Sequence, residues 1–261
     1  MENIVQVILL GIIEGITEFL PISSTGHLLI AEHWLGQRSD LFNVAIQAGA
    51  ILAIVLIYWR RLWDLLMHFS RPENRDYVYK LAVSFLITVV GGLAAKKLGL
   101  SLPQTIAPVA VAMLVGGLII FVAEYLASRQ APREELTWSV AIWVGLAQIL
   151  AAVFPGTSRS AATIFAAMFA GLTSRPAATE FAFLVGIPTM FAATAFEGLK
   201  AYKDGGLQNE DWGALALGFA VSAVVAFIAV KWLLRYIQTH RFTIFAWYRV
   251  AFGALLLALA L

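Results

Sequence analysis

Two short polar turns interrupt long apolar stretches of this chain, and they carry the residues whose types and spacing could do chemistry. The first turn is Pro-Ile-Ser-Ser-Thr-Gly-His at 21–27, preceded by Glu14 and Glu18. The second is Pro-Gly-Thr-Ser-Arg-Ser-Ala-Ala-Thr at 155–163, which contains Arg159. An arginine in hydrocarbon costs about 2.5–3.5 kcal/mol on insertion scales, so such residues usually face a cavity and hold an anion or a carboxylate. The sequence therefore predicts a buried anion site at Arg159.

Glu14 and Glu18 form an acidic pair. They are four residues apart, so on a helix they share one face. Neighbouring carboxylates repel each other, and burial adds a desolvation cost to each. A hard divalent cation, Mg²⁺ or Ca²⁺, with carboxylate and phosphate oxygens as ligands would compensate both effects, and we expect a chelator to abolish activity. The alternative is that one glutamate is protonated or that both line a wet vestibule.

The first turn precedes a second short helix. The hydroxyls of Ser23, Ser24 and Thr25 can cap this helix, and with Gly26 they surround its N–H groups, which attract anions. For any one hydroxyl, capping alone is the simpler interpretation. His27 could act as general acid, general base or nucleophile, or it could be a structural histidine. Ser24 is a rival nucleophile, and the sequence does not choose between these two and water.

The second turn repeats this arrangement with a cation in place of the carboxylates. The guanidinium of Arg159 offers a planar fork of donors that matches a phosphate bidentately. The candidate phosphate-binding residues around it are Gly156, Thr157, Ser158, Ser160 and Thr163. The competing interpretation of Arg159 is a structural ion pair with Glu14 or Glu18, which would also bring the two turns together.

Composition places these turns in a membrane protein. The chain of 261 residues is 61% hydrophobic and 13% charged, whereas a soluble domain is usually about 25% charged. It has no cysteine, which excludes disulfides and a zinc-thiolate site, and its net charge of +2 is too small to indicate nucleic acid binding. The first apolar run leads into the polar turn without a cleavage site, so we interpret it as mature structure.

Six apolar stretches reach the roughly 20 residues that a bilayer requires. They are 42–59, 77–97, 103–127, 179–199, 212–236 and 242–261. Two further regions, 4–36 and 137–171, each consist of an apolar helix, a polar turn and a short apolar helix. A polar turn is tolerated at membrane depth only inside protein or a water-filled cavity. The predicted fold is an all-α polytopic membrane protein with six full spans and two re-entrant helical hairpins.

The two hairpins share one pattern. Each residue of the second set lies 134 positions after its counterpart in the first, as in Gly11 and Gly145, Pro21 and Pro155, and Ser24 and Ser158. Three spans follow each hairpin, so the second half enters from the opposite face. We therefore expect an inverted-topology repeat of 1–127 and 137–261 within one membrane domain, with the site at the repeat interface. Chance similarity of apolar sequence is the alternative.

The positive charges predict an orientation. Twelve Lys and Arg residues, Arg249 included, fall on one side of this topology and five on the side of the termini, with Arg159 left out of the count. Cytoplasmic loops carry the excess of Lys and Arg. We therefore expect both termini outside the cytoplasm.

The motifs resemble those of the undecaprenyl-diphosphatase family, integral membrane enzymes associated with bacitracin resistance. The family's Glu-x-x-x-Glu pair matches 14–18, its Pro-x-Ser-Ser-Thr-Gly-His stretch matches 21–27, and its Pro-Gly-x-Ser-Arg-Ser-x-x-Thr motif matches 155–163. The resemblance covers essentially the whole chain. Carried over by position, the functional set is Glu14, Glu18, Ser24, His27, Ser158, Arg159 and Thr163.

The resemblance implies an activity and a place in the cell. It implies hydrolysis of undecaprenyl diphosphate to undecaprenyl phosphate and inorganic phosphate, which recycles the lipid carrier for cell-wall synthesis. It also implies a divalent metal, the bacterial plasma membrane, and a site open to the outer leaflet. The expected partners are a polyprenyl diphosphate and membrane lipids; a homodimer is left open.

Other functions fit the same residues. Inverted repeats with broken helices are also typical of transporters, so a transporter or flippase of a polyprenyl phosphate is the main alternative. The acid-phosphatase-like lipid phosphatases use similar Ser-Gly-His elements, but the repeat and the glutamate pair argue against them. A purely structural scaffold would give no reason to bury four ionisable groups.

Overall fold

The computed structural model describes residues 2–100, 102–103, 105–203 and 210–260, and within them the chain is entirely helical, without strands. An all-α fold is thus confirmed. The helices of these residues are α1 (Glu2–Thr17), α2 (Ser24–Leu35), α3 (Asp40–Ile57), α4 (Trp59–Met67), α5 (Pro72–Lys97), α6 (Ile106–Ala127), α7 (Trp138–Val153), α8 (Arg159–Phe169), α9 (Arg175–Lys203), α10 (Trp212–Tyr236) and α11 (Thr243–Ala260).

Five helices of the described chain are long and apolar enough to cross a membrane, namely α3, α5, α6, α9 and α10. They correspond to five of the six predicted spans. The sixth, 242–261, contains α11, whose apolar part, Thr243–Ala258, is shorter than the helices counted as spans. Large apolar side chains such as Leu86, Val111 and Val224 are exposed on these helices. Outer faces of this kind suit contact with lipid, and the chain is a multi-pass membrane protein.

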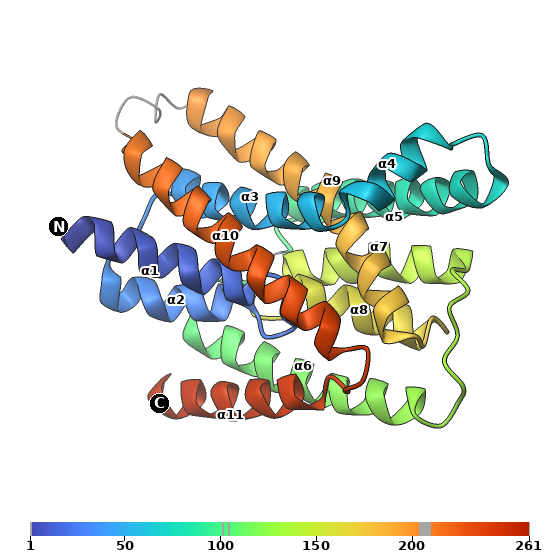
Figure 1. Ribbon diagram of the computed structural model, residues 1–261. Coiled ribbons are helices and arrows are strands. Elements are labelled where there is room, and N and C mark those ends of the chain that lie inside the picture. Colours follow the sequence, from blue (N-terminus) through green and yellow to red (C-terminus); the bar gives the residue numbers. More distant parts are fainter. Residues whose placement is uncertain (1, 101, 104, 204–209, 261) are drawn as a thin grey trace.

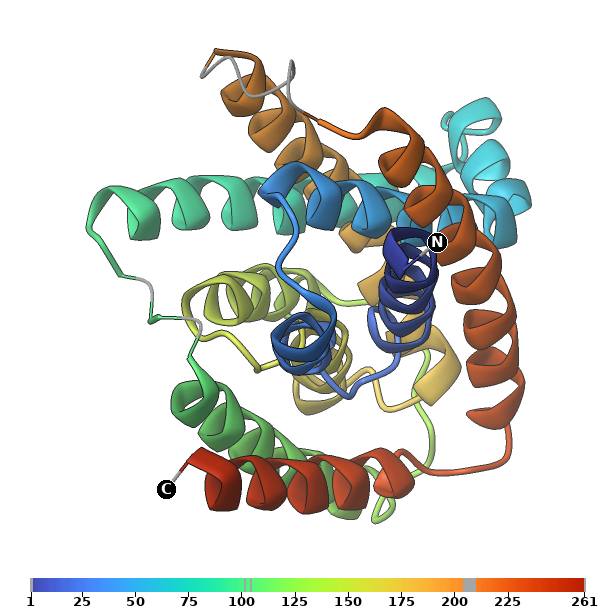
Figure 2. The same cartoon turned by 90° about the vertical axis from the view of Figure 1, so that its left-hand side faces the viewer.

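The four shorter helices of the two predicted hairpins lie in the middle of the molecule, and the longer helices enclose them (Figure 2). Helices α1 and α2 lie toward the end that carries both termini, and α7 and α8 lie toward the opposite end (Figure 1). Helix α1 packs on α10 and α2, whereas α7 packs on α5 and α8. Helices α6 and α11 pair along one side. Both polar turns are therefore held between helices instead of facing lipid.

Glycines set the closest of these helix crossings. A Cβ added at Gly11 in α1 would lie 3.0 Å from the Gly218 carbonyl oxygen, and one added at Gly145 in α7 would lie 2.8 Å from the Ser84 carbonyl oxygen. Small residues let apolar helices approach this closely. The two glycines are 134 positions apart, and so are Ser84 and Gly218. The same crossing is thus built twice, and in each case the partner helix belongs to the other half of the chain.

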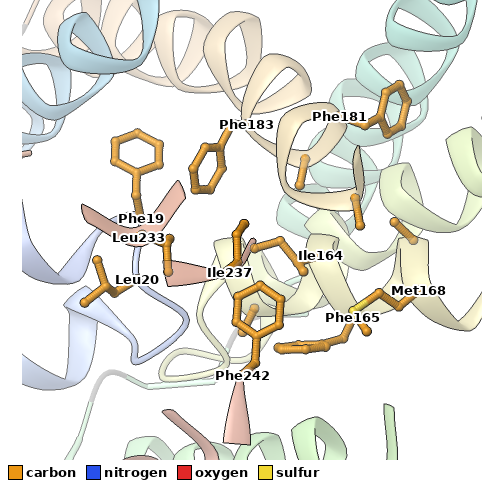
Figure 3. Close-up of a cluster of buried hydrophobic side chains, with 14 of the residues drawn as sticks. Phe19, Leu20, Ile164, Phe165, Met168, Phe181, Phe183, Leu233, Ile237 and Phe242 are labelled. Atoms are coloured by element: carbon orange, nitrogen blue, oxygen red, sulfur yellow. The ribbon is translucent and has the colours of Figure 1, made fainter. Parts of the chain in front are cut away.

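Aromatic side chains fill the core beside the turns (Figure 3). Phe19, in the turn that follows α1, meets Phe183 of α9 edge to face, with ring centroids 5.1 Å apart. Phe165 of α8 meets Phe242 in the same manner at 5.3 Å. Such pairs add about 0.5–1.5 kcal/mol beyond the area they bury. They fix the helices on either side of the polar turns.

Helix α4 is absent from the sequence-based prediction. Its sequence mixes arginine and aspartate with apolar residues, so it is too polar to be recognised as a span. Asn74 joins it to α5, since its Nδ2 donates to the Asp64 carbonyl oxygen at 3.1 Å and to Asp64 Oδ2 at 3.0 Å. The hydrogen bond from Asn74 is the main reason why the pKa of Asp64 lies below its usual value, and nearby His68 and Arg71 add to the effect.

Candidate active site

Each polar turn ends in a serine that caps the next helix. Ser23 caps α2, and its Oγ accepts a hydrogen bond from Gly26 N at 3.4 Å; Ser158 caps α8, and its Oγ accepts from Ala161 N at 3.3 Å. Both serines have positive φ, 73° and 68°. A non-glycine residue in this region is uncommon, and such strained residues cluster at functional sites.

The caps correct one detail of the predicted repeat. Ser23 and Ser158 are 135 positions apart, so the offset of 134 that pairs Ser24 with Ser158 is wrong at the caps. The second turn has one more residue between its proline and its cap. Gly156 accommodates this residue with a φ of 90°, and a Cβ added there would lie 2.6 Å from the Val109 carbonyl oxygen.

An ion pair joins the two turns. Arg159 Nη2, at the start of α8, donates to Glu18 Oε1 at 2.9 Å. Ser24 Oγ, at the start of α2, donates to Glu18 Oε2 at 2.6 Å. The Glu18 side chain is 8% exposed and the Arg159 side chain 19%. The structure thus brings together the acidic and basic residues that the sequence placed in separate halves.

A glycine on α9 makes room for the guanidinium. A Cβ added at Gly186 would lie 2.3 Å from Arg159 Nη1. On another side, Arg159 Cζ lies 5.8 Å from the centroid of the Phe19 ring. The sequence gives no sign that Gly186 belongs to the site, because only the packing shows which glycine faces the arginine.

The other hydroxyls of the second turn bond mainly to protein. Ser160 Oγ donates to the Leu20 carbonyl oxygen at 3.1 Å, which ties α8 to the first turn. Ser160 Oγ therefore accepts from Ser158 Oγ, 3.1 Å away. Thr163 Oγ1 donates to the Arg159 carbonyl oxygen at 2.8 Å. To contact a phosphate as predicted, these three hydroxyls would have to give up their present hydrogen bonds. Thr25 and Thr157 are partly exposed at the turns.

Glu14 is the least satisfied polar residue of the site. Its side chain is fully buried, and within the described chain neither carboxylate oxygen has a hydrogen-bond partner. Burying an unpaired carboxylate is costly, so a proton or a cation is needed there. No cluster of three or more His, Asp or Glu side chains able to hold a metal occurs among these residues. A donor set of Glu14 and Glu18 suits Mg²⁺, which is often bound by one or two carboxylates together with substrate phosphates and water.

His27 is turned toward α11. Its Nδ1 lies 2.7 Å from the Ser23 carbonyl oxygen, which can only accept, so Nδ1 carries a proton. Its Nε2 lies 2.6 Å from Tyr248 Oη, and in the neutral tautomer it accepts from that hydroxyl. The imidazole also stacks on Phe252, with centroids 4.7 Å apart. Both ring nitrogens are therefore occupied, and Tyr248 is a neighbour that the sequence analysis did not identify.

Arg249 also lies at the turns, which corrects the charge count. It is fully buried in α11, and its guanidinium donates to carbonyl oxygens of both turns, to Pro21 at 3.4 Å and to Gly156 at 3.1 Å. It also donates to Ala112 and Met113 of α6. The prediction that Arg249 belongs to the positively charged membrane face is wrong, because it lies too near the start of an apolar segment for composition to show its depth. The available signal was an isolated arginine inside that segment.

The fold and this centre define the class: a polytopic helical membrane protein in which two capped turns, one acidic and one basic, share an enclosed polar site. The chain belongs to the bacitracin resistance protein BacA family, whose pattern it matches over residues 7–255.

Close relatives carry a functional name. The chain is 64% identical over 252 residues to the undecaprenyl-diphosphatase of Rhizobium etli (strain CIAT 652), covering 97% of this chain and 95% of the relative. It is 56% identical over 257 residues to the undecaprenyl-diphosphatase of Xanthomonas oryzae pv. oryzae (strain PXO99A), covering 98% and 97%. These names agree with the resemblance of the motifs and do not favour the transporter alternative.

Proposed function

We propose that this protein hydrolyses undecaprenyl diphosphate to undecaprenyl phosphate and inorganic phosphate, recycles the lipid carrier for cell-wall synthesis and thereby confers resistance to bacitracin. The observation that carries the proposal is the contact between Glu18 and Arg159 at the point where the N-termini of α2 and α8 meet. The relatives named above supply the identity of the lipid.

The diphosphate binds where positive charge converges. Within the described chain Arg159 makes one side-chain hydrogen bond, to Glu18. A guanidinium has five N–H donors, so others remain for a phosphate. The helix N-termini behind Ser23 and Ser158 add N–H groups and the positive ends of two helix dipoles. These donors also stabilise the charge that develops on the transferred phosphoryl group.

Ser24 is the nucleophile that the geometry favours over His27 and water. Its hydroxyl already donates to Glu18 at 2.6 Å, within the reach expected of a nucleophile and its base. The Ser24 oxygen bonds to the terminal phosphorus, Glu18 takes the hydroxyl proton, and the anhydride bond breaks to release undecaprenyl phosphate. Water then attacks the phosphoserine, and inorganic phosphate leaves as the serine regains a proton.

Glu14 and Glu18 are the residues that would hold a divalent cation, Mg²⁺ or Ca²⁺. When bound, the cation neutralises part of the negative charge of the diphosphate. The unpartnered oxygens of Glu14 support this assignment, because a lone buried carboxylate is otherwise unfavourable.

We place the protein in the bacterial plasma membrane with both termini outside the cytoplasm, and we interpret the helix pairs α1–α2 and α7–α8 as re-entrant hairpins of an inverted repeat. The matched crossings at Gly11 and Gly145 support the repeat, because both members of each contact are displaced by the same 134 residues. On this arrangement the two turns approach each other from opposite leaflets.

The test uses purified full-length protein and undecaprenyl diphosphate labelled at its terminal phosphorus. Wild-type protein should release labelled phosphate, stop when a chelator is added, and carry label on Ser24 after rapid quenching. Ser24→Ala should carry no label and release little phosphate. Binding of the lipid without release by the wild type would overturn the proposed activity in favour of transport, and label on His27 would overturn the assignment of the nucleophile.

A further inference from the structure

An apolar groove runs along α8 from the second turn. Its volume is about 570 Å³, and α8 lines it with Ala161, Ala162, Phe165, Ala166, Phe169 and Ala170. This volume is within the roughly 300–1,000 Å³ of typical ligand sites. The groove exists because α6 and α7 each pack on α8, which lies between them in Figure 1, without an extensive contact with each other in the described chain. Alanines along α8 leave the space between these walls unfilled.

The groove is open to the surroundings of the helices. Trp143 and Leu150 of α7 line one wall and are 56% and 48% exposed, and Ile119 of α6 on the other wall is 41% exposed. Exposed apolar side chains on the helices of a membrane protein face hydrocarbon, so a flexible apolar chain could enter sideways from the bilayer. Water-soluble ligands would gain little from such walls.

One end of the groove lies at the second turn. Thr157 lines this end and directly precedes Ser158 and Arg159. Gly116 lines the same groove, and a Cβ added there would lie 2.2 Å from the Arg249 guanidinium, which donates to Gly156 of the second turn. The groove and the charged centre therefore both adjoin the second turn, the groove at Thr157 and the centre at Arg159.

We propose that this groove binds the isoprenoid chain of the lipid diphosphate, with the first isoprene units beside Thr157 and later units along α8 toward Ala170. The proposal rests on the proposed function, because it takes the diphosphate to lie at Arg159. From Ala162 to Ala170 the helix rises about 12 Å, so units of the chain at different distances from the phosphate contact different alanines.

Substitutions along the groove should act according to chain length. Ala166→Trp should raise the KM for undecaprenyl diphosphate at least about tenfold more than the KM for farnesyl diphosphate, because it removes apolar contacts made by the distal units. Ala162→Trp, nearer the turn, should raise both. Ala220→Trp, on an exposed position of α10, is the matched control and should change neither. Equal effects of Ala166→Trp on both lipids, with a normal control, would overturn the groove assignment.

A second measurement does not depend on hydrolysis. The chain has no cysteine, so Ala166→Cys introduces a single thiol for alkylation by a maleimide. Undecaprenyl phosphate should slow alkylation of this thiol at least about tenfold, as burial in a groove requires, whereas inorganic diphosphate should not. Ala220→Cys should show no protection by either. Equal protection at both positions, or none at Ala166→Cys, contradicts the proposal, and protection of the Ala166→Cys thiol by lipid in a protein that releases no phosphate contradicts only the proposed activity.

Discussion

Helices α1 and α7 carry a buried polar residue at equivalent positions, Glu14 and Gln148, but the two side chains differ in their hydrogen bonds. In α7, Gln148 Nε2 donates to Thr88 Oγ1 at 2.9 Å, and the pair is buried between α7 and α5, although Gln148 Oε1 has no partner among the described residues. The residues 134 positions away are Glu14 and Ser222, and within the described chain their side-chain oxygens have no partner although both are fully buried.

The two helices differ in the hydrogen bonds that their buried polar side chains make. A buried amide can be satisfied by a neighbouring hydroxyl, so Gln148 and Thr88 stabilise the contact between α7 and α5. A buried carboxylate without a partner adds no such stability, so Glu14 needs a proton or a cation. Each half contributes a serine cap; the second half adds the guanidinium of Arg159, and the first half adds the carboxylates of Glu14 and Glu18.

Removing the guanidinium of Arg159, in the second half, should have the largest effect on activity. We expect Arg159→Ala to reduce phosphate release from undecaprenyl diphosphate about 10³-fold, as loss of a donor to developing charge does. Arg159→Lys should recover only part of the activity, because lysine lacks the planar fork. Initial rates at saturating lipid check this, and an activity within tenfold of wild type for Arg159→Ala would mean that the ion pair is structural.

Replacing Glu14 by the glutamine found at the equivalent position of the second half should have the second largest effect. We expect Glu14→Gln to weaken the dependence of activity on Mg²⁺ at least about a hundredfold, and to raise Tm in metal-free buffer, because a neutral amide costs less to bury. The reciprocal Gln148→Glu should lower Tm, since it places a charge beside Thr88. Metal titrations and thermal melts in detergent check both, and unchanged metal dependence in Glu14→Gln would remove this residue from the metal site.

Separating the two turns should mainly affect stability. Arg249→Lys offers one compact group of donors in place of a fork that reaches Pro21 and Gly156. We expect it to lower the free energy of unfolding by about 1–3 kcal/mol, the cost of leaving a buried acceptor unsatisfied. Denaturant titration measures this, and an unchanged midpoint would show that the two carbonyl groups find other donors.

Narrowing the space for Arg159 from α9 should have a smaller effect on the rate. Gly186→Ala places a methyl group where Nη1 lies, so the guanidinium must shift. We expect a fall in kcat of about tenfold from this misplacement. Gly198→Ala on the same helix is the control, since a Cβ there meets open space. A normal rate for Gly186→Ala would show that Arg159 can move without loss.

The smallest effect is expected far from the turns, at the α4–α5 connection. Asn74→Ala should lower Tm by about 2–4 °C at neutral pH and leave hydrolysis unchanged. The folded-state pKa of Asp64 is depressed, so its contribution is complete above the ordinary value of 3.8 and is lost as pH falls through the lowered pKa. The difference in Tm between wild type and variant should therefore narrow below about pH 4. A difference that stays constant with pH would assign the effect to the backbone acceptors alone.

The sequence predicts the apolar helices well, because hydropathy is a strong signal. It offers the ion pair of Arg159 only as a competing interpretation and does not choose between Glu14 and Glu18 as its partner. It does not predict Arg249 or Gly186, since their roles depend on which helices become neighbours.

The sequence pattern pairs Ser24 with Ser158, whereas the structure shows that Ser23 and Ser158 are the equivalent caps. This difference of one residue follows from the path of the backbone at Gly156, which the sequence pattern does not show. Helix α4 is missed because it is short and because its charged residues are typical of a loop.

Helix α11 follows every other helix of the described chain, yet it carries the guanidinium that links both turns. Because a chain is made from its N-terminus, both turns are translated before this donor exists. The carbonyl groups of Pro21 and Gly156 acquire it only when α11 packs on α6. A partly made chain that ends before α11 therefore holds both turns without the guanidinium that links them.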